Sequence, residues 1–406
     1  MKILHTADWH LGQSFIHFDR NEEHQLALDW LLDLIKNEAI DVLIIAGDVF
    51  DIGSPTNYAR RMYYSFLTQL LATNCKNTVI IGGNHDSPSM LDAPRDLLES
   101  LNIKVVSAAS DNLQDEIIEI KNAKNELQAV IAAVPFLRDR DLKSAVAFES
   151  GYDKAEQLKK GIYQHYHDVA DLCKNYKKVP VIATGHLFAK GSQASEKQDN
   201  IYLGNMENIS GEQFPKVFDY VALGHIHRAQ TIENQEHIRY SGSLIPLSFS
   251  ENQDRKSVTI IDFQGKKIEK ITEIDVPSFR KLITFKGEID AIKEKLTNLD
   301  AKLKLQLETD FKLKSWVEII VESETIAPNL EQEMQEFCKS MHLEILKFRT
   351  VYKNQTSFAT HFLAKDLKEL SEMEVFQQRL QSVPAEEHAA LTDTFKELYE
   401  MYRLVD

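Results

Sequence analysis

The stretch Val79-Ile80-Ile81-Gly82-Gly83-Asn84-His85-Asp86 joins a buried-strand pattern to three polar side chains. Its β-branched apolar residues predict a strand, and the paired glycines end that strand sharply. In an open α/β sheet, ligands bind beyond the carboxyl ends of the strands. Taken alone the signal is modest, because Asn and Asp also occur in ordinary turns. It gains weight because other strands of the chain end in the same way.

Two strands nearer the N-terminus carry similar polar residues at their ends. Lys2–Thr6 is followed by Asp8-Trp9-His10, and Val42–Ala46 is followed by Gly47-Asp48-Val49-Phe50-Asp51. Residues two apart on an extended segment point to the same side, so Asp8 and His10 can reach one cation. The tripeptide by itself is more often a turn aspartate beside an unrelated histidine. Repetition at successive strand ends favours a site.

Helical spacing of apolar residues between these strands predicts parallel βαβ units. The expected helices cover Glu22–Lys36, a segment through about Leu71, and Ser89–Ser100. The chain then becomes rich in β-strand patterns up to Pro135. A further long crossover helix is expected over Asp153–Tyr176, where we interpret His165 and His167 as surface residues.

The second half of this region repeats the pattern with histidines. A strand over Val179–Thr184 precedes Gly185-His186, and Asp219–Leu223 precedes Gly224-His225-Ile226-His227. Two histidines in a His-x-His arrangement form a good chelate for a first-row metal. A lone histidine such as His186 is more often a core residue, but its place at a strand end favours a functional one.

Two short β segments follow the last histidines. They cover His237–Tyr240 and Ser257–Ile261, with Ser241-Gly242-Ser243 between them. The glycine-containing turn predicts that the two segments are antiparallel strands closing a second sheet.

The composition narrows the class of protein. A chain of 406 residues with 43% hydrophobic residues fits two or three globular domains, and no apolar run is long enough to span a membrane. The N-terminus has no signal-peptide pattern. Three cysteines, far apart and odd in number, argue against a disulfide framework and favour the reducing cytoplasm. The net charge of −15 is not typical of a nucleic-acid binder, so a DNA substrate would require an asymmetric surface or a partner that grips it.

The pattern changes near Val276-Pro277, after which no ligand-rich strand ends occur. A β-α-β-α-β order between Leu282 and Val351 predicts a small α+β domain. Lys353–Thr360 is typical of a linker, and Asp366–Leu380 and Glu387–Leu404 are amphipathic helices. A terminal helix pair suits docking or dimerisation, although a packed C-terminus is nearly as frequent. We therefore expect three regions: residues 1–275, 276–352 and 353–406.

The polar residues at strand ends form one candidate metal centre. They offer only imidazole, carboxylate and amide groups, which suits Mn²⁺, Fe or Zn²⁺ better than Ca²⁺. Their number is about what two divalent ions need, and a bridging carboxylate joins such ions in two-metal hydrolysis sites. We expect Asp48 to be the bridge. The candidate ligands are Asp8, His10, Asp48, Asn84, His186, His225 and His227.

His85 lies next to a candidate ligand and is itself a candidate for catalysis. An imidazole at this place could stabilise the transition state or protonate the leaving alkoxide. We expect Asp86 to hold the other ring nitrogen of His85.

The ordered motifs Asp-x-His, Gly-Asp-x-x-Asp, Gly-Asn-His-Asp, Gly-His and Gly-His-x-His resemble the calcineurin-like metallophosphoesterase superfamily. Through about residue 262 the likeness extends to the bacterial DNA double-strand-break nucleases of that superfamily. It is carried by His5–Gln13, Ala46–Pro55, Ala222–Gln230 and Arg239–Phe249.

The resemblance implies a fold and a site. The fold would be a four-layer α/β/β/α sandwich with a small α+β capping domain and a C-terminal helical tail. One divalent ion, Mn²⁺ by this resemblance, would be held by Asp8, His10, Asp48 and His227. The other would be held by Asp48, Asn84, His186 and His225. His85 would be the catalytic histidine. Some relatives of the archaeal and eukaryotic branch carry His at the position of Asp51, so a second histidine role is not transferred.

The resemblance also implies partners. The terminal helices would bind a coiled-coil ATPase in a heterotetramer, the small domain would cap DNA, and the helices around Tyr58–Leu71 and Ser89–Ser100 would form a homodimer contact. The leading hypothesis is a Mn²⁺-dependent DNA nuclease, a double-strand exonuclease and a single-strand or hairpin endonuclease, acting at the nucleoid in the cytoplasm. The alternatives are a phosphatase or cyclic-nucleotide phosphodiesterase, and a DNA-end tether with incidental catalysis.

Four cations lie on loops or helix starts near the predicted site. Each is a candidate phosphate contact, although solvated surface charge is the more common role for such residues. They are Arg20, Arg60, Arg61 and Lys190.

Overall fold

The computed structural model describes residues 1–142, 151–193, 209–306, 313–323 and 329–352, with isolated positions between 376 and 395. Residues 1–322 and 327–351 form one compact unit. The linker and the two helices expected beyond residue 352 lie outside the described residues, apart from those isolated positions. We call residues 1–275 the large lobe and residues 282–352 the small lobe.

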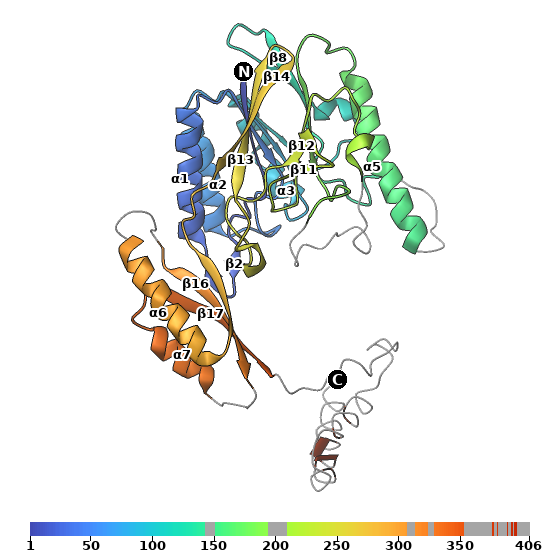
Figure 1. Ribbon diagram of the computed structural model, residues 1–406. Coiled ribbons are helices and arrows are strands. Elements are labelled where there is room, and N and C mark those ends of the chain that lie inside the picture. The colour runs from blue at the N-terminus through green and yellow to red at the C-terminus, as the bar shows by residue number, and fades with distance from the viewer. Residues whose placement is uncertain are drawn as a thin grey trace. The chain divides into compact units, whose positions relative to one another are not determined.

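The first sheet of the large lobe is built on four parallel strands with crossover helices (Figure 1). In spatial order its strands are β14 (Lys267–Asp275), β13 (Ser257–Gln264), β1 (Lys2–Thr6), β4 (Val42–Ala46), β5 (Asn77–Ile81) and β6 (Ile103–Val106). Strand β13 pairs with β1 in antiparallel fashion. The helices are α1 (Asn21–Asn37), α2 (Asn57–Leu70), α3 (Pro88–Asp92) and α4 (Arg95–Ser100).

The second sheet also has a parallel centre and antiparallel edges. Its strands in spatial order are β11 (Gln230–Ile232), β12 (Gln235–Tyr240), β10 (Tyr220–Gly224), β9 (Val181–His186), β8 (Leu127–Ala132) and β7 (Ile117–Lys121). Helix α5 (Gly151–Cys173) packs against it. Shorter elements are the hairpin β2 (Ser14–Phe15) and β3 (Phe18–Asp19) and the 3₁₀ turns Leu113–Glu116, Gly211–Gln213 and Phe249–Glu251.

Three apolar clusters separate four layers. The middle cluster lies between the two sheets, where Val42 and Ile44 of β4 share one core with Ile182 of β9 and Ala222 of β10. The alternate residues Leu43 and Ile45 face α1 and α2. Because both faces of these central strands are buried, their sequences are continuously apolar. The α/β/β/α sandwich expected for the large lobe is confirmed.

Two details of the expected large lobe are wrong. The segment 89–100 is two short helices rather than one, because Pro94 follows Ala93 and interrupts the helix. The strands containing His237–Tyr240 and Ser257–Ile261 do not pair with each other. The first pairs with β10 in the second sheet and the second pairs with β1 in the first sheet, so the Ser241–Ser243 turn begins a crossing between sheets.

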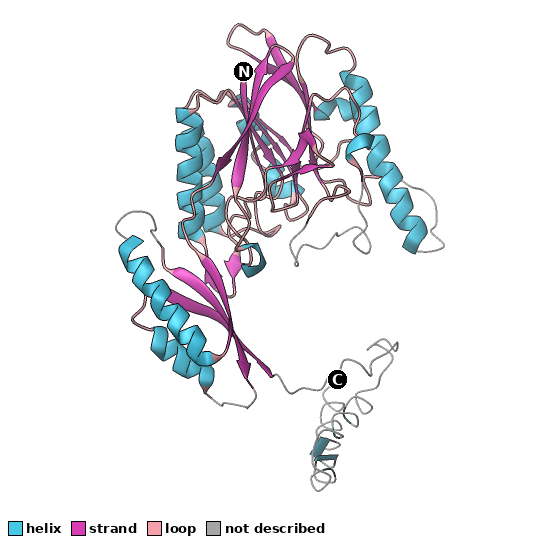
Figure 2. Cartoon of the chain, in the orientation of Figure 1, coloured by secondary structure: helices cyan, strands magenta, loops and turns pink. Residues whose placement is uncertain are grey.

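The small lobe has the order β15 (Leu282–Gly287), α6 (Ile289–Gln306), β16 (Ser315–Ser323), α7 (Leu330–Cys338) and β17 (Leu343–Tyr352). Its strands form one sheet in the order β15-β16-β17, and both helices cover one face of it (Figure 2). Val317, Ile319 and Val321 face these helices, so the alternate residues of β16 face away from them.

No helix in the described part of the chain combines the length and the hydropathy that a membrane span requires.

Candidate metal centre

The candidate ligands come together where the strands of both sheets end. The loops after β1 and β4 are joined by backbone bonds from Asp8 N to the Gly47 carbonyl (3.1 Å) and from His10 N to the Asp48 carbonyl (3.0 Å). The second sheet is tied to the first by the His225 N–H, which donates to Asp8 Oδ1 (2.9 Å). The centre is therefore built across the two sheets.

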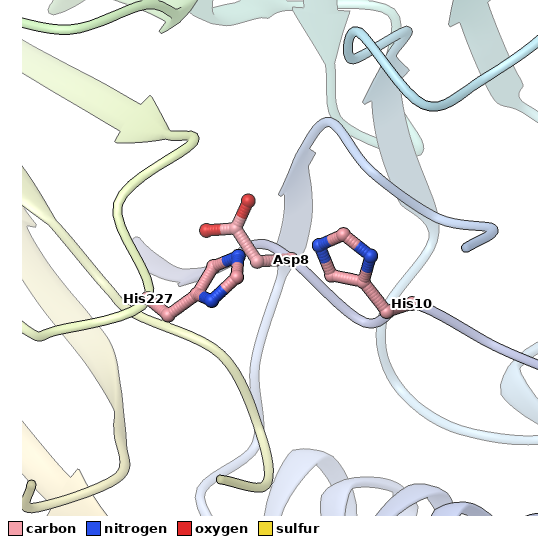
Figure 3. Close-up of side chains that lie close together, drawn as sticks. All are labelled: Asp8, His10 and His227. Carbon is pink, nitrogen blue, oxygen red and sulfur yellow. The ribbon is translucent and has the colours of Figure 1, made fainter. Parts of the chain in front are cut away.

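One cluster consists of Asp8, His10 and His227 (Figure 3), each offering a ligand atom, with the three atoms within 4.8 Å of one another. Asp8 and His10 come from the loop after β1, and His227 comes from the loop after β10. Within the described part of the chain, Asp8 Oδ2 and His10 Nε2 are buried without a hydrogen-bond partner. A buried unsatisfied polar atom costs about 1–3 kcal/mol. A cation bound here would satisfy both atoms, so the donor set fits a divalent metal.

A second cluster consists of Asp48, His186 and His225. The Asn84 Oδ1 atom lies 3.0 Å from His186 Nε2 and 3.0 Å from His225 Nδ1, so it faces the same point. The His186 Nδ1–H donates to the Ala46 carbonyl (2.9 Å), which leaves Nε2 directed at the cluster. This orientation suits an imidazole that ligates through Nε2.

Asp48, a member of the second cluster, also faces the first cluster. Its Oδ2 atom is 3.1 Å from His186 Nε2 and 3.5 Å from His10 Nε2, while Oδ1 accepts the His85 N–H (2.9 Å). The expected bridging position is therefore occupied by a buried carboxylate whose Oδ2 contacts one histidine of each cluster.

Glycines make this close approach possible. A Cβ at Gly83 would lie 2.1 Å from Asp48 Oδ1, and a Cβ at Gly47 would lie 2.3 Å from His186 Nδ1. Gly47 also has a positive φ of 88°. The glycines that end β4 and β5 therefore leave room for a carboxylate and an imidazole rather than only closing a turn.

The ligand loops are also strained. Asp8, His10, Asp48 and His225 have φ values of 53°, 46°, 49° and 95°. Non-glycine residues in this region cost on the order of 1–3 kcal/mol each and cluster at functional sites. The hydrogen bonds between the loops hold these conformations.

The charges of the second cluster depend on Asp48. Burial opposes its ionisation, but the His186 ring beside it holds the pKa of the Asp48 carboxyl well below its usual range. Burial disfavours the charged His186 ring, yet the carboxylates of Asp48 and Asp8 raise its pKa to about 9. Burial lowers the pKa of His225 to about 3. Without metal, His186 therefore carries the proton at neutral pH and His225 is neutral.

Two carboxylates outside the predicted set orient ligand histidines. Asp51 Oδ1 lies 3.1 Å from His10 Nδ1, and Glu251 Oε1 lies 3.0 Å from His227 Nδ1. The buried Lys256 ammonium donates to Glu251 Oε2 (2.6 Å) and to the His227 carbonyl (2.9 Å). Such partners fix which ring nitrogen faces a metal. The sequence signalled Asp51 through its motif but gave no sign of Glu251.

His85 is exposed and lies beside the first cluster. Its Nδ1 lies 2.6 Å from the Asp51 carbonyl, and a carbonyl only accepts, so Nδ1 carries the proton. Nε2 is the ring nitrogen left for a substrate.

The expected contact between Asp86 and His85 is wrong. The buried Asp86 carboxylate instead accepts the backbone N–H groups of Gly83 (2.9 Å), Val49 (3.1 Å) and Phe50 (3.0 Å). It ties the loop that carries His85 to the loop that carries Asp48. Asp86 is therefore a structural residue of the site, and the Asp51 carbonyl takes the place predicted for it.

The proposed phosphate contact at Arg20 is also wrong. Arg20 is 1% exposed, and its guanidinium forms a two-pronged ion pair with Glu23. The other cations lie elsewhere: Arg61 and Lys190 are exposed, and Arg60 donates to Asn57. None of the four lines the cavity that contains the metal ligands.

That cavity has a volume of about 930 Å³ and two walls. One wall carries His10, Asp48, Asn84, His85, His225 and His227, and the other carries residues of the small lobe: Thr284, Glu318, Ile320, Lys347 and Arg349. The candidate metal centre therefore opens into a cleft that the small lobe helps to form.

Residues 1–229 match the family of calcineurin-like phosphoesterases, and residues 278–383 match the type 5 capsule protein repressor C-terminal domain. Since the first match covers more than half of the chain, the protein is a calcineurin-like phosphoesterase, a hydrolase of phosphoester bonds.

Curated relatives define the family more narrowly. The chain is 36% identical over 383 residues to the SbcD component of the nuclease SbcCD of Escherichia coli K12, covering 94% of this chain and 92% of the relative. It is 27% identical over 408 residues to the component of the same name from Bacillus subtilis, covering 98% and 93%. The chain belongs to the SbcD family of nuclease components.

Solved structures show more distant likeness. A dimetal phosphatase from Danio rerio shares 14% identity at a TM-score of 0.40, covering 68% of this chain and 99% of that one. TT1561 of Thermus thermophilus shares 14% identity at a TM-score of 0.35, covering 68% and 98%.

Replacing Gly83 by alanine should weaken metal binding, because the new Cβ would displace the Asp48 carboxylate. We expect Mn²⁺ affinity to fall by at least about tenfold, as when ligand orientation is lost in metal sites. Metal content after equilibrium dialysis measures this. Gly53→Ala is the matched control, since its Cβ would meet nothing closer than 3.6 Å. Equal metal content in the two variants would contradict the role of Gly83.

Metal affinity should rise with pH. Because His186 has a pKa of about 9 without metal, binding at neutral pH must displace its proton. Each displaced proton gives about a tenfold gain in affinity per pH unit below the pKa of its group and none well above it. Calorimetric Mn²⁺ titrations in two buffers of different ionisation enthalpy would count the released protons. Binding without proton release at pH about 7 would contradict the assignment.

Proposed function

We propose that this protein is the metal-dependent DNA nuclease component of a DNA repair complex, acting on double-stranded ends as an exonuclease and on single strands or hairpins as an endonuclease. The observation that carries the proposal is the meeting of two N/O clusters around the shared Asp48 carboxylate. The site of action would be the nucleoid, in the cytoplasm.

The proposed cofactor is a pair of divalent ions, with Mn²⁺ as the preferred metal. Asp8, His10, Asp48 and His227 would hold one ion, and Asp48, Asn84, His186 and His225 the other. Bound there, such ions supply a hydroxide nucleophile at neutral pH and neutralise charge on the phosphate oxygens. The donors contain nitrogen and oxygen only, which supports this choice over a thiolate-bound metal.

The proposed catalytic residue is His85. Its Nδ1–H is directed to the Asp51 carbonyl, which fixes the ring, and in the imidazolium form its Nε2–H would donate a proton to the leaving oxygen of the cleaved phosphodiester. Asp86 supports His85 indirectly, because it holds the loop after β5 against the loop after β4. The ring is therefore oriented before a substrate binds.

Several features support DNA rather than a small ester as the substrate. The relatives that match nearly the whole chain are named as parts of a nuclease, and the cleft has a second wall in the small lobe. Residues 276–352 would cap DNA over the metal centre. A hydrolase of small esters would have little need for such an added lobe.

The name of these relatives, which makes them one component of the nuclease SbcCD, supports a complex. We propose that residues 353–406 bind an SbcC-type coiled-coil ATPase and that two copies of each chain form a heterotetramer. A homodimer contact through α2 and α4 is supported by exposed apolar residues on or beside these helices: Tyr58, Leu97 and Leu101.

The nuclease assignment is tested with purified protein on linear duplex DNA, hairpin-ended DNA and p-nitrophenyl phosphodiesters, in Mn²⁺, Mg²⁺ or chelator, with and without the ATPase. Mn²⁺-dependent DNA cleavage that the partner and ATP extend on duplex ends is the expected result. Turnover of small esters with intact DNA would indicate a small-molecule phosphodiesterase. Inactivity on every substrate would favour a DNA-end tether.

His85→Gln should lose cleavage but keep metal and DNA binding, because His85 is not among the proposed ligands. Removal of a general acid typically lowers a rate by about 10²–10⁴-fold. The rate is measured on hairpin DNA, with Mn²⁺ content and DNA affinity determined in parallel. His167→Gln, in helix α5, is the control. A His85→Gln enzyme that cleaves at the normal rate would exclude the proposed role.

A further inference from the structure

A separate group of charged and aromatic residues, away from the metal centre, lies where the two lobes meet. It is centred on Trp316, at the start of β16, which is 2% exposed. The Phe15 ring of the β2–β3 hairpin stacks on the Trp316 ring at 5.6 Å between centroids and 5° between planes, and Phe18 lies 5.9 Å away. The hairpin begins four residues after the candidate ligand His10. This packing therefore links the small lobe to a ligand loop.

Two arginines enclose the same tryptophan. The guanidinium of Arg280 lies 3.9 Å from the Trp316 ring centroid, and that of Arg20 lies 5.7 Å away. Both cations contact the buried Glu23 carboxylate: Arg20 Nη2 at 2.7 Å and Arg280 Nε at 3.4 Å. The aromatic face of Trp316 adds a cation–π contact to this shared ion pair.

We call the contacts of Trp316 with Phe15, Arg20 and Arg280 the joint between the lobes. Arg20 extends this joint toward the metal centre. Its Nη1 atom donates to the Gln13 side chain (3.1 Å) and to the Pro246 carbonyl. Gln13 in turn donates through its side chain to the Leu247 carbonyl (3.2 Å) and through its backbone N–H to the His10 carbonyl (3.0 Å). A continuous set of contacts therefore runs from Trp316 to the backbone of His10.

The position of Trp316 in its strand gives the joint a consequence. Residues 316, 318 and 320 point to one face of β16, because side chains alternate along a strand. Trp316 is held by the large lobe, while Glu318 and Ile320 line the cleft opposite the metal ligands. On the neighbouring strand, Leu282 pairs with Trp316 and Thr284 with Glu318, and Thr284 lines the same cleft. Anchoring Trp316 therefore fixes the distance between the small lobe's cleft residues and the metal ligands.

We propose that Trp316 is a positioning residue that sets substrate class: held by Phe15, Arg20 and Arg280, it keeps the small lobe's sheet at the distance from the metal centre that a DNA strand requires. The inference rests on the nuclease function proposed above. A small phosphodiester needs only the metal ligands and His85, whereas a DNA strand passes between both walls. Loosening the joint separates the two activities.

The test compares wild-type protein and Trp316→Ala on two substrates with Mn²⁺: linear duplex DNA and bis(p-nitrophenyl) phosphate. We expect kcat/KM on DNA to fall by at least about tenfold, since misplacing a positioning element costs far more than its own contacts. Turnover of the ester should stay within about twofold, as for changes that do not reach the reacting groups. Trp316→Phe, which keeps an aromatic ring for stacking, should recover DNA cleavage.

Further variants separate this role from a general effect on folding. Arg280→Ala removes one cation while leaving the Arg20–Glu23 ion pair, and it should reproduce the selective loss. Phe337→Ala, on an exposed face of α7, is the matched aromatic control and should change neither activity. Hydrogen exchange of residues 13–20 should become faster in Trp316→Ala and Arg280→Ala, because the hairpin loses its contact with the small lobe.

Each outcome decides the proposal. A parallel loss of both activities in Trp316→Ala and Arg280→Ala would overturn it, since the joint would then support the metal centre as a whole. Unchanged DNA cleavage in both variants would overturn it as well. Ester turnover by wild-type protein that leaves DNA intact would instead remove the nuclease function, and the proposal with it, and would be seen before any variant is compared.

Discussion

The large lobe depends on one buried charge, the Asp48 carboxylate. A carboxylate removed from water is stable only with charged or hydrogen-bonding partners. Here the partners are imidazoles from both sheets and the His85 N–H. The glycines after β4 and β5 and the left-handed backbone of the ligand loops follow from this arrangement, because every group must approach Asp48 closely. The strained ligand loops surround the same point, as do the buried Asp8 and His10 atoms that lack a hydrogen bond. Both features are expected of a site that binds cations.

Much of this site could be predicted because its chemistry is local. A continuously apolar strand, then glycine, then a polar side chain is visible at residues 42–48 and 79–86, and the edge at which parallel strands end is common to the sheet. The ligand residues therefore stood out in the chain, and the sandwich followed from a family resemblance carried by the same motifs.

The rest could not be predicted because it depends on partners distant in sequence. Glu251 orients His227 from a 3₁₀ turn without any motif, and the strands at 235–240 and 257–264 look alike but join different sheets. Arg20 appeared to be a surface cation because its burial depends on Trp316, almost 300 residues later in the chain. Asp86 belongs to the site, but its predicted role was wrong, because a carboxylate after a strand can accept a hydrogen bond from an imidazole or from backbone N–H groups equally well.

The division of the ligands between the two sheets has a consequence for biosynthesis. Asp8, His10, Asp48 and Asn84 are translated before His186, His225 and His227, which follow more than 100 residues later. Domains fold largely as units while the chain leaves the ribosome. The donors of the first sheet therefore cannot be joined by His186, His225 and His227 until the loop after β10 has emerged. During that interval the nascent chain holds an incomplete set of donors that attracts cations only weakly. Capture of metal is thereby delayed until both sheets have contributed their donors.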